Sequence, residues 1–250
     1  MSMLDPIFNP LLQLDVLWIV FIISLVVSLI IIVIYKYTTN QDLMKQLKEE
    51  IKAFQKETKE LKAHPEKMME VQKKAMKTNM KYMTHSMRST LYTFIPIILI
   101  FGWMNANIAY EPIYPDQEFN VTAIFGKGTI GDIELIAPTG VEVLGNSTQE
   151  IKDNEASWIL KGSEGDYINE NALEFEFEGQ TRYKDLIITN EQKYAKTKEK
   201  IKNSGLKIVQ IENKPMKILN LFGWKIGWLG TYIIFSLVFS ILLRKIFKVY

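Results

Sequence analysis

The feature that most constrains this chain is an uncharged apolar run from Val16 to Tyr35, VLWIVFIISLVVSLIIIVIY. A helix of this length covers the hydrocarbon core of a bilayer, which is about 30 Å thick. A secretory signal peptide is the alternative interpretation. The acidic residues Asp5 and Asp15, the length of the run and the absence of a small-residue cleavage site disfavour it. The run therefore predicts a transmembrane helix.

A second apolar block near the C-terminus, Ile226 to Leu243, predicts another membrane span. It contains no charged residue and is followed by basic residues. Trp224, Trp228 and Tyr232 lie near its start, and amphipathic rings of this kind favour the membrane–water interface.

The block between them, Leu91 to Met104, is short for a full span and contains Pro96. A re-entrant or buried core segment is therefore its alternative. Basic residues before the block and an acidic region after it favour a span. We expect its helix to continue back through Met83 and Met87.

The distribution of basic residues predicts an orientation. Lysine and arginine near membrane segments favour the cytosolic side. Lys36 follows the first span, Lys81 and Arg88 precede the second, and Arg244 and Lys245 follow the third. The sequence thus predicts a multi-pass protein of the cell membrane with its N-terminus outside and its C-terminus in the cytosol.

The segment between the first two spans predicts a cytosolic helical hairpin. Residues 40–62 place apolar side chains at helical spacing, interrupted by Thr58. His64-Pro65 ends this helix, because the residue before proline avoids the α region. A second helix follows. Two helices joined by a short break favour an antiparallel coiled coil, for which a solvated structural arm is the simplest interpretation.

The second helix of this hairpin is rich in methionine. Met76, Met80, Met83 and Met87 are spaced i, i+4, i+7 and i+11, so they share one face. Flexible, polarisable methionine suits surfaces that bind varied apolar partners, but it also packs readily into cores. Both interpretations stay open. The flanking lysines Lys73, Lys74, Lys77 and Lys81 could lie near anionic lipid headgroups or ribosomal RNA.

Between the second and third spans the pattern becomes typical of β-structure, with short alternating runs separated by Gly- and Asn-containing turns. We expect a small external antiparallel sheet or sandwich, with a charged helix at residues 191–203 and a last strand from Leu206 to Ile211. Glycosylation sequons begin at Asn120 and Asn146, which is consistent with an external region.

Catalytic chemistry has little support in the sequence. The chain has no cysteine and only two histidines, and it lacks nucleotide-binding or nucleophile-elbow motifs. We therefore expect no enzymatic activity, cofactor, metal site or small-molecule substrate.

The order of segments resembles the YidC/Oxa insertase superfamily, and in particular its archaeal three-span branch, which is related to the insertase subunit of the ER membrane protein complex. The resemblance rests on HPEKMM from His64 to Met69, QKKAM from Gln72 to Met76, NMKYM from Asn79 to Met83, and the apolar segment around Pro96. It covers most of residues 10–105 and 222–245. The β-rich region is an insertion relative to the bacterial core, and the spans lack the arginine that some bacterial relatives carry in their membrane groove.

The resemblance implies an insertase and chaperone that acts in protein transport without ATP. Its partners would be nascent membrane proteins, membrane lipids, and the ribosome or the Sec translocon through the basic hairpin. The methionines would bind client helices. Hydroxyl side chains would line a polar groove between the spans, although small polar residues also serve ordinary helix packing. The groove candidates are Ser24, Ser28, Thr90, Thr93, Ser236 and Ser240. A membrane-anchored binding or scaffold protein that acts through the β domain is the alternative.

The predicted fold is therefore a membrane α-helical bundle of three spans, with a cytosolic antiparallel coiled-coil hairpin and an external sandwich-like β-rich domain. The segments are 1–38 for the N-terminus and first span, 39–88 for the hairpin, 89–106 for the second span, 107–220 for the β-rich domain, and 221–250 for the third span and C-terminus.

Overall fold

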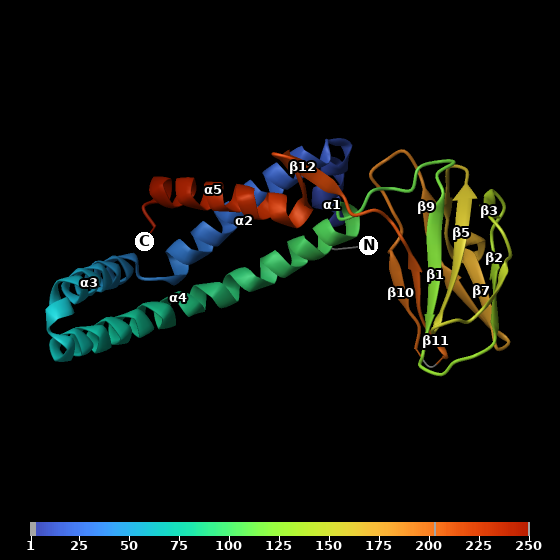
Figure 1. Ribbon diagram of the computed structural model, residues 1–250. Helices are drawn as coiled ribbons and strands as arrows, with labels where there is room; N and C mark the ends of the chain where they lie inside the picture. The colour runs from blue at the N-terminus through green and yellow to red at the C-terminus, as the bar shows by residue number, and fades with distance from the viewer. Residues whose placement is uncertain (1–3, 203, 250) are drawn as a thin grey trace. The chain divides into compact units, whose positions relative to one another are not determined.

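The computed structural model describes residues 4–202 and 204–249 and divides the chain into two compact units (Figure 1). The helical unit contains the described residues up to Gly102 and those from Leu229 onward. The β-rich unit contains the described residues between Trp103 and Trp228. The predicted combination of membrane helices with a separate β-rich domain is confirmed.

In the part of the chain that the structure describes, five α-helices and two short 3₁₀ segments lie before or after the strands. In chain order they are α1 (Asp5–Phe8), η1 (Asn9–Gln13), α2 (Val16–Thr38), α3 (Gln41–Glu60), η2 (Leu61–Ala63), α4 (Pro65–Asn107) and α5 (Trp228–Phe247).

Among the described residues, three helical stretches are long and apolar enough to cross a membrane. They are α2, residues Ser89–Asn107 of α4, and α5. Helix α2 begins where the Asp15 carboxylate accepts a hydrogen bond from the Leu17 amide at 2.8 Å, which satisfies one of the unpaired donors of a helix start. Helix α4 runs without interruption through Pro96, as the expected continuation through Met83 and Met87 requires.

Aromatic contacts join the spans within the helical unit. The Phe21 ring of α2 lies edge-on to Phe235 and Phe239 of α5, with centroids 5.4 and 5.1 Å apart. Phe101 of α4 meets Tyr232 of α5 in the same way, at 4.8 Å. Edge-to-face geometry is favourable because the positive edge of one ring meets the negative face of the other. Helix α5 therefore contacts both other spans.

Helices α3 and α4 form a hairpin in which the two run side by side (Figure 1). The Asn40 side chain caps α3 by accepting from the Leu43 amide at 3.1 Å. At the far end, η2 and the non-helical His64 (φ −126°, ψ 80°) separate α3 from α4, which starts at Pro65. The predicted break at His64-Pro65 is confirmed.

The β-rich unit contains thirteen strands in its described residues. They are β1 (Phe119–Phe125), β2 (Asp132–Ile136), β3 (Val141–Val143), β4 (Thr148–Glu150), β5 (Glu155–Gly162), β6 (Gly165–Tyr167), β7 (Leu173–Phe177), β8 (Gln180–Lys184), β9 (Leu186–Ile188), β10 (Lys198–Lys200), β11 (Leu206–Ile211), β12 (Lys217–Leu221) and β13 (Trp224–Gly227), with a 3₁₀ turn η3 (Asn169–Asn171) between β6 and β7.

These strands form two larger antiparallel sheets and two hairpin-sized ones. The orders are β10-β11-β1-β5-β3, β4-β2-β7-β8, β6-β9 and β12-β13. Side chains from both larger sheets meet in one core, where Trp158 of β5 lies edge-on to Phe175 of β7 at 5.7 Å. The Trp158 indole donates to the Ser147 carbonyl at 2.7 Å, so its polar atom is satisfied.

Two sequence expectations need correction in this unit. Residues 191–202 do not form a helix, because β10 pairs with β11 and the preceding coil binds the end of α4. There, the Tyr194 hydroxyl donates to the Asn105 carbonyl at 2.9 Å, and the Gln192 amide donates to the Asn107 carbonyl at 3.1 Å. Helix carbonyls at a C-terminus lack intrahelical partners, so both bonds are capping contacts.

The second correction concerns the last strand of this unit, and with it the start of the third span. Strand β11 is not the last strand, and α5 begins at Trp228 because Trp224–Gly227 is strand β13. A short apolar run does not by itself distinguish a strand from a helix.

Candidate functional site

The four methionines of α4 lie on the surface of the helical unit. We call Met76, Met80, Met83 and Met87 the methionine face; their side chains are 67, 60, 50 and 60% exposed. Apolar side chains of this size are costly to leave in water when they gather on one face. Their exposure argues against the alternative that they pack into the core of this chain.

The opposite side of α4 is the side that packs. Val71, Thr78 and Ser89 are buried, and Tyr82 is half-buried against the cluster of Ile32, Tyr35, Met44 and Val249. At about 100° per residue, Val71, Thr78 and Ser89 project roughly opposite to the methionine face. The helix therefore divides its contacts, with one side held by α2 and α3 and the other left open.

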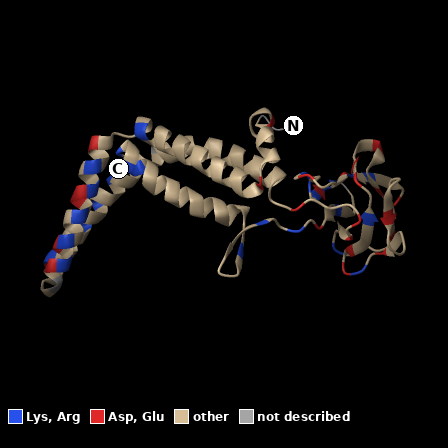
Figure 2. Cartoon of the chain, turned by 90° about the horizontal axis from the view of Figure 1, so that it is seen from above, with Lys and Arg blue, Asp and Glu red and all other residues tan. Residues whose placement is uncertain are grey.

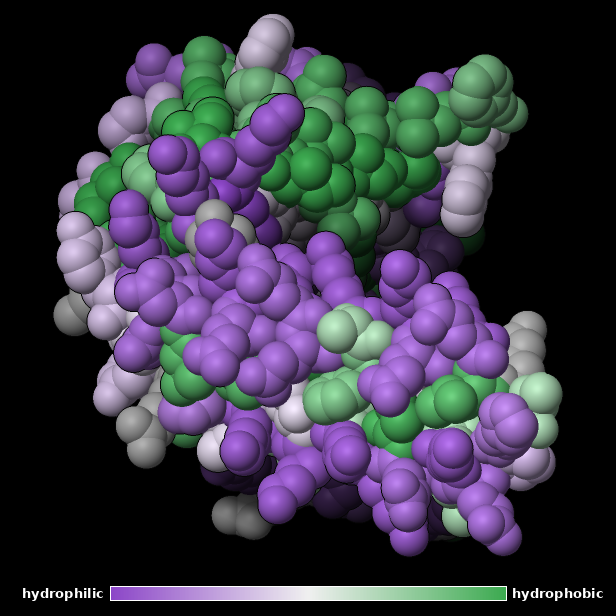
Figure 3. Space-filling model, turned by 90° about the vertical axis from the view of Figure 1, so that its left-hand side faces the viewer, coloured by the Kyte–Doolittle hydropathy of each residue, from purple (hydrophilic) through white to green (hydrophobic). Residues whose placement is uncertain are grey.

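The candidate lysines lie on the same stretch of α4, with Lys73 and Lys77 nearer to the methionine face than Lys74 and Lys81. Lys73, Lys74, Lys77 and Lys81 are exposed, and among the described residues none of them forms an ion pair. Figure 2 shows Lys and Arg concentrated along the hairpin, whereas the apolar lengths of the spans carry almost no charge. Figure 3 shows the same contrast: hydrophilic residues cover the hairpin end around small apolar areas, and hydrophobic residues cover the spans.

The six hydroxyl residues predicted to line a groove differ in burial. Ser24, Ser28 and Thr93 are buried, Thr90 is exposed, and Ser236 and Ser240 of α5 are half-buried.

Several of these hydroxyls bond to their own helix. Ser24 donates to the Phe21 carbonyl at 2.9 Å, Thr93 to Thr90 at 3.0 Å, and Ser236 to Ile233 at 3.0 Å. Such local bonds satisfy a hydroxyl within an apolar bundle and leave its lone pairs as acceptors. A groove shared by all six stays a prediction.

Among the described residues of the three spans, two buried serine or threonine residues were not in the predicted set. Ser89 of α4 and Thr231 of α5 are 1 and 0% exposed. Ser89 lies one turn before Thr93, so the i,i+4 pairing of the two could have identified it. No comparable spacing marks Thr231.

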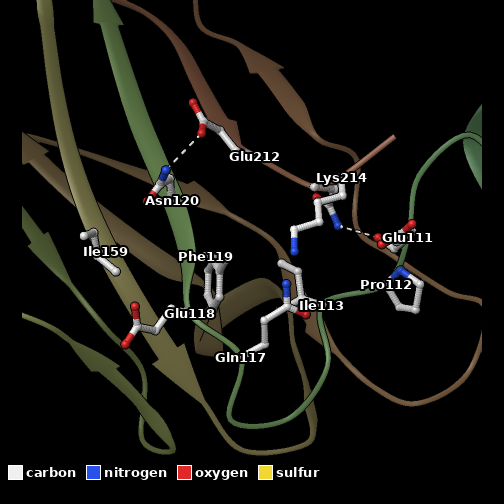
Figure 4. A pocket seen from close by; sticks show the side chains of 11 residues that line it. Glu111, Pro112, Ile113, Gln117, Glu118, Phe119, Asn120, Ile159, Glu212 and Lys214 are labelled. Carbon is white, nitrogen blue, oxygen red and sulfur yellow. Dashed lines mark hydrogen bonds between the residues drawn. The ribbon is translucent and has the colours of Figure 1, made fainter. Parts of the chain in front are cut away.

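The β-rich unit contains a pocket of about 340 Å³ (Figure 4). Its wall includes the carboxylates of Glu118 and Glu212 and the ring of Phe119. The Asn120 amide, which begins a sequon, donates to the Glu212 carboxylate at 3.1 Å. The arrangement is an open hollow with a mixed polar and apolar lining, and its lining residues include no paired nucleophile and base.

Three apolar helical stretches, with a basic hairpin between the first two, define an integral membrane protein. The sequence profile of the family described as integral membrane protein EMC3/TMCO1-like matches residues 2–125. The chain belongs to this family, which is part of the Oxa1/YidC/Alb3/EMC insertase superfamily. The resemblance predicted from the hairpin motifs is thus confirmed at the level of the superfamily.

The family consists of insertase- or channel-type membrane proteins that are not known as enzymes. The match ends at the end of β1, so most of the β-rich unit lies beyond it. No curated protein and no solved structure matches the chain.

Proposed function

We propose that this protein is a membrane insertase and chaperone that receives client transmembrane helices on the methionine face and passes them into a polar groove between its spans. The observation that carries the proposal is the exposed methionine face on a helix that continues directly into the second span. Membership of an insertase superfamily supports it.

Helix α4 offers a continuous route from water to lipid. A client helix would first cover the exposed thioethers, whose flexible side chains adapt to different shapes. It would then follow the same helix toward Ser89–Asn107, where α4 enters the membrane. Nothing in this route requires nucleotide hydrolysis, because burial of the client's apolar surface is itself favourable.

The polar groove addresses the most expensive step, the passage of a client's polar flank through hydrocarbon. An unpaired polar group there costs several kcal/mol. Buried hydroxyls such as Ser24, Ser28 and Thr93 would accept hydrogen bonds from that flank. We propose that Thr90, Ser236, Ser240 and the buried Ser89 also line this groove.

The hairpin lysines would contact ribosomal RNA or anionic lipids, both of which carry negative charge. Contact of the same hairpin with the Sec channel is also part of the proposal. The proposal also includes coiled-coil packing of α3 on α4 and a sandwich-type β-rich unit. We also propose that the chain belongs to the archaeal branch of the superfamily. Its proposed segments are 1–38, 39–88, 89–106, 107–220 and 221–250.

The proposed topology places the hairpin in the cytosol and the β-rich unit outside the cell membrane, because basic residues flank all three spans on the same side. Cysteines replacing the exposed Lys59 and Asn146 can be treated with an impermeant thiol reagent in intact cells. We expect labelling at position 146 and protection at position 59 until the membrane is permeabilised. Labelling at position 59 with protection at position 146 would show that the protein has the opposite orientation in the membrane.

Photocrosslinking tests the function. A benzophenone amino acid replaces Met80 in the full chain during cell-free synthesis of a membrane protein. We expect adducts with nascent chains that contain a transmembrane helix and few with a nascent soluble protein. His85 is the matched control position, because it is exposed on the same helix but outside the methionine face. Equal client adducts from both positions, or none from Met80, would reject the proposal.

A further inference from the structure

The β12–β13 hairpin is a separate feature of the β-rich unit. Among the described residues, its two strands pair only with each other, whereas the inner strands of the two larger sheets have a neighbour on each side. An isolated two-stranded hairpin is marginally stable in water unless its apolar face is covered. Such a hairpin therefore needs a partner surface.

One face of this hairpin is apolar. The cross-strand pairs Leu219–Ile226 and Leu221–Trp224 share it, since side chains alternate along each strand. The pair Asn220–Lys225 projects from the other face. The hairpin is thus amphipathic, with its largest apolar side chain near the turn.

The turn itself presents an aromatic ring to its surroundings. Phe222 and Gly223 form a two-residue loop with φ of 52° and 89°, and the Asn220 carboxamide oxygen accepts from the Gly223 amide at 3.0 Å. The Phe222 side chain is fully exposed and that of Trp224 is 76% exposed. A bulky residue with positive φ is strained by about 1 kcal/mol or more, so the turn holds this ring outward at a cost.

The hairpin is tethered to the membrane boundary. Strand β13 ends at Gly227, and the membrane helix α5 begins at the next residue, Trp228. The four residues of β13 span only about 13 Å. The tip therefore stays close to the lipid headgroups that surround the start of α5, and Lys217 and Lys225 suit anionic headgroups.

We propose that the β12–β13 hairpin is an interfacial membrane anchor, in which Leu221, Phe222 and Trp224 insert into the boundary between lipid headgroups and acyl chains. Aromatic rings are favoured in this region, where an apolar body and wet surroundings meet. The anchor would hold the β-rich unit at the bilayer surface through the chain that leads into α5.

The chain contains no cysteine, so a single probe can be placed without altering the native sequence elsewhere. Leu221→Cys in the full chain is labelled with the environment-sensitive dye NBD, which leaves Phe222 and Trp224 in place. The protein is reconstituted into vesicles of phosphatidylcholine and phosphatidylglycerol, with or without doxyl-labelled phosphatidylcholine. Asn146→Cys, in an exposed turn of the same unit, is the control. We expect blue-shifted emission and quenching by doxyl lipid at position 221 but not at position 146.

The aromatic residues are tested in the same background. Phe222→Ser with Trp224→Ser should abolish most of the shift and the quenching, while circular dichroism stays unchanged because neither side chain belongs to the core. Water-like emission at position 221 would overturn the anchor. Blue-shifted emission that doxyl lipid leaves unquenched would also overturn it and indicate a protein surface as the partner. Full quenching in the double-serine variant would exclude the aromatic rings as the inserting groups.

Discussion

Replacement of the four residues of the methionine face by serine is expected to reduce the capture of nascent transmembrane helices at least about tenfold. Full burial of one methionine is worth roughly 1.5–3 kcal/mol, and about 1.4 kcal/mol corresponds to a factor of ten in binding. The measurement is photocrosslinking from a probe placed in the client helix. Because all four side chains are exposed, the substitutions should leave the protein folded and inserted.

Two matched variants separate apolarity from other effects. Leucine at the four positions keeps the apolar area and loses only flexibility, so it should retain most of the capture. Glutamine keeps the length and helix propensity of methionine but removes the apolar surface, so it should behave like serine. If the serine and glutamine variants capture clients as well as the parent does, the methionine face does not bind them.

The membrane helices were predictable because the bilayer imposes a length and a composition that few other structures share. The apolar run from Val16 and the structural helix α2 begin at the same residue. Strand β1 shows the alternation predicted for this region, since every second residue of Phe119–Phe125 faces the core. The proline at position 65 separated two helices through a local steric effect.

The errors fell where tertiary contacts override local preference. Residues 191–202 are rich in charged residues with good helix propensity, yet Tyr194 and Gln192 are held by the end of α4. Burial raises the pKa of Tyr194 to about 12, so its hydroxyl keeps its proton and remains a donor to Asn105. Neither partner is adjacent in sequence, so no local pattern could have shown these bonds.

The candidate site likewise has features that the sequence predicted and features that depend on tertiary packing. The spacing of the methionines predicted that they share a face, but only the structure shows that this face is the exposed one. Likewise, the hydroxyl residues of the spans were visible as a composition, whereas the burial of Ser89 and Thr231 depends on how the helices pack.

A pH-dependent stability is expected from Lys184, a buried lysine on β8. Its side chain is 2% exposed, and its ammonium group donates to the carbonyl of Asp185 at 3.0 Å and to that of Lys196. Burial lowers the pKa of Lys184 to about 8 from 10.5, although Asp185 and Glu199 oppose the shift. The bonds join β8 to the coil before β10 and thus secure the segment that also caps α4.

The sign follows from proton binding. Between about pH 8 and 10.5 the unfolded chain binds more protons at this lysine than the folded chain does, so stability contributed by Lys184 rises with pH in that window. Below pH 8 both states are protonated, and the folded state bears the cost of a buried charge. The maximum slope is about 1.4 kcal/mol per pH unit.

Comparison with Lys184→Met isolates this contribution from other titrating groups. We expect the free energy of unfolding of the parent to rise more steeply than that of the variant between pH 8 and 10, by up to about 1.4 kcal/mol per pH unit. Urea titrations of the full chain in detergent, followed by Trp158 fluorescence with the other four tryptophans replaced by phenylalanine, measure the difference. The variant's absolute stability is a separate matter, because the carbonyls of Asp185 and Lys196 lose their donor. If the free energies of unfolding of the two proteins change in parallel across this pH range, Lys184 has the same pKa in the folded and unfolded chains. Its burial would then have no effect on its protonation.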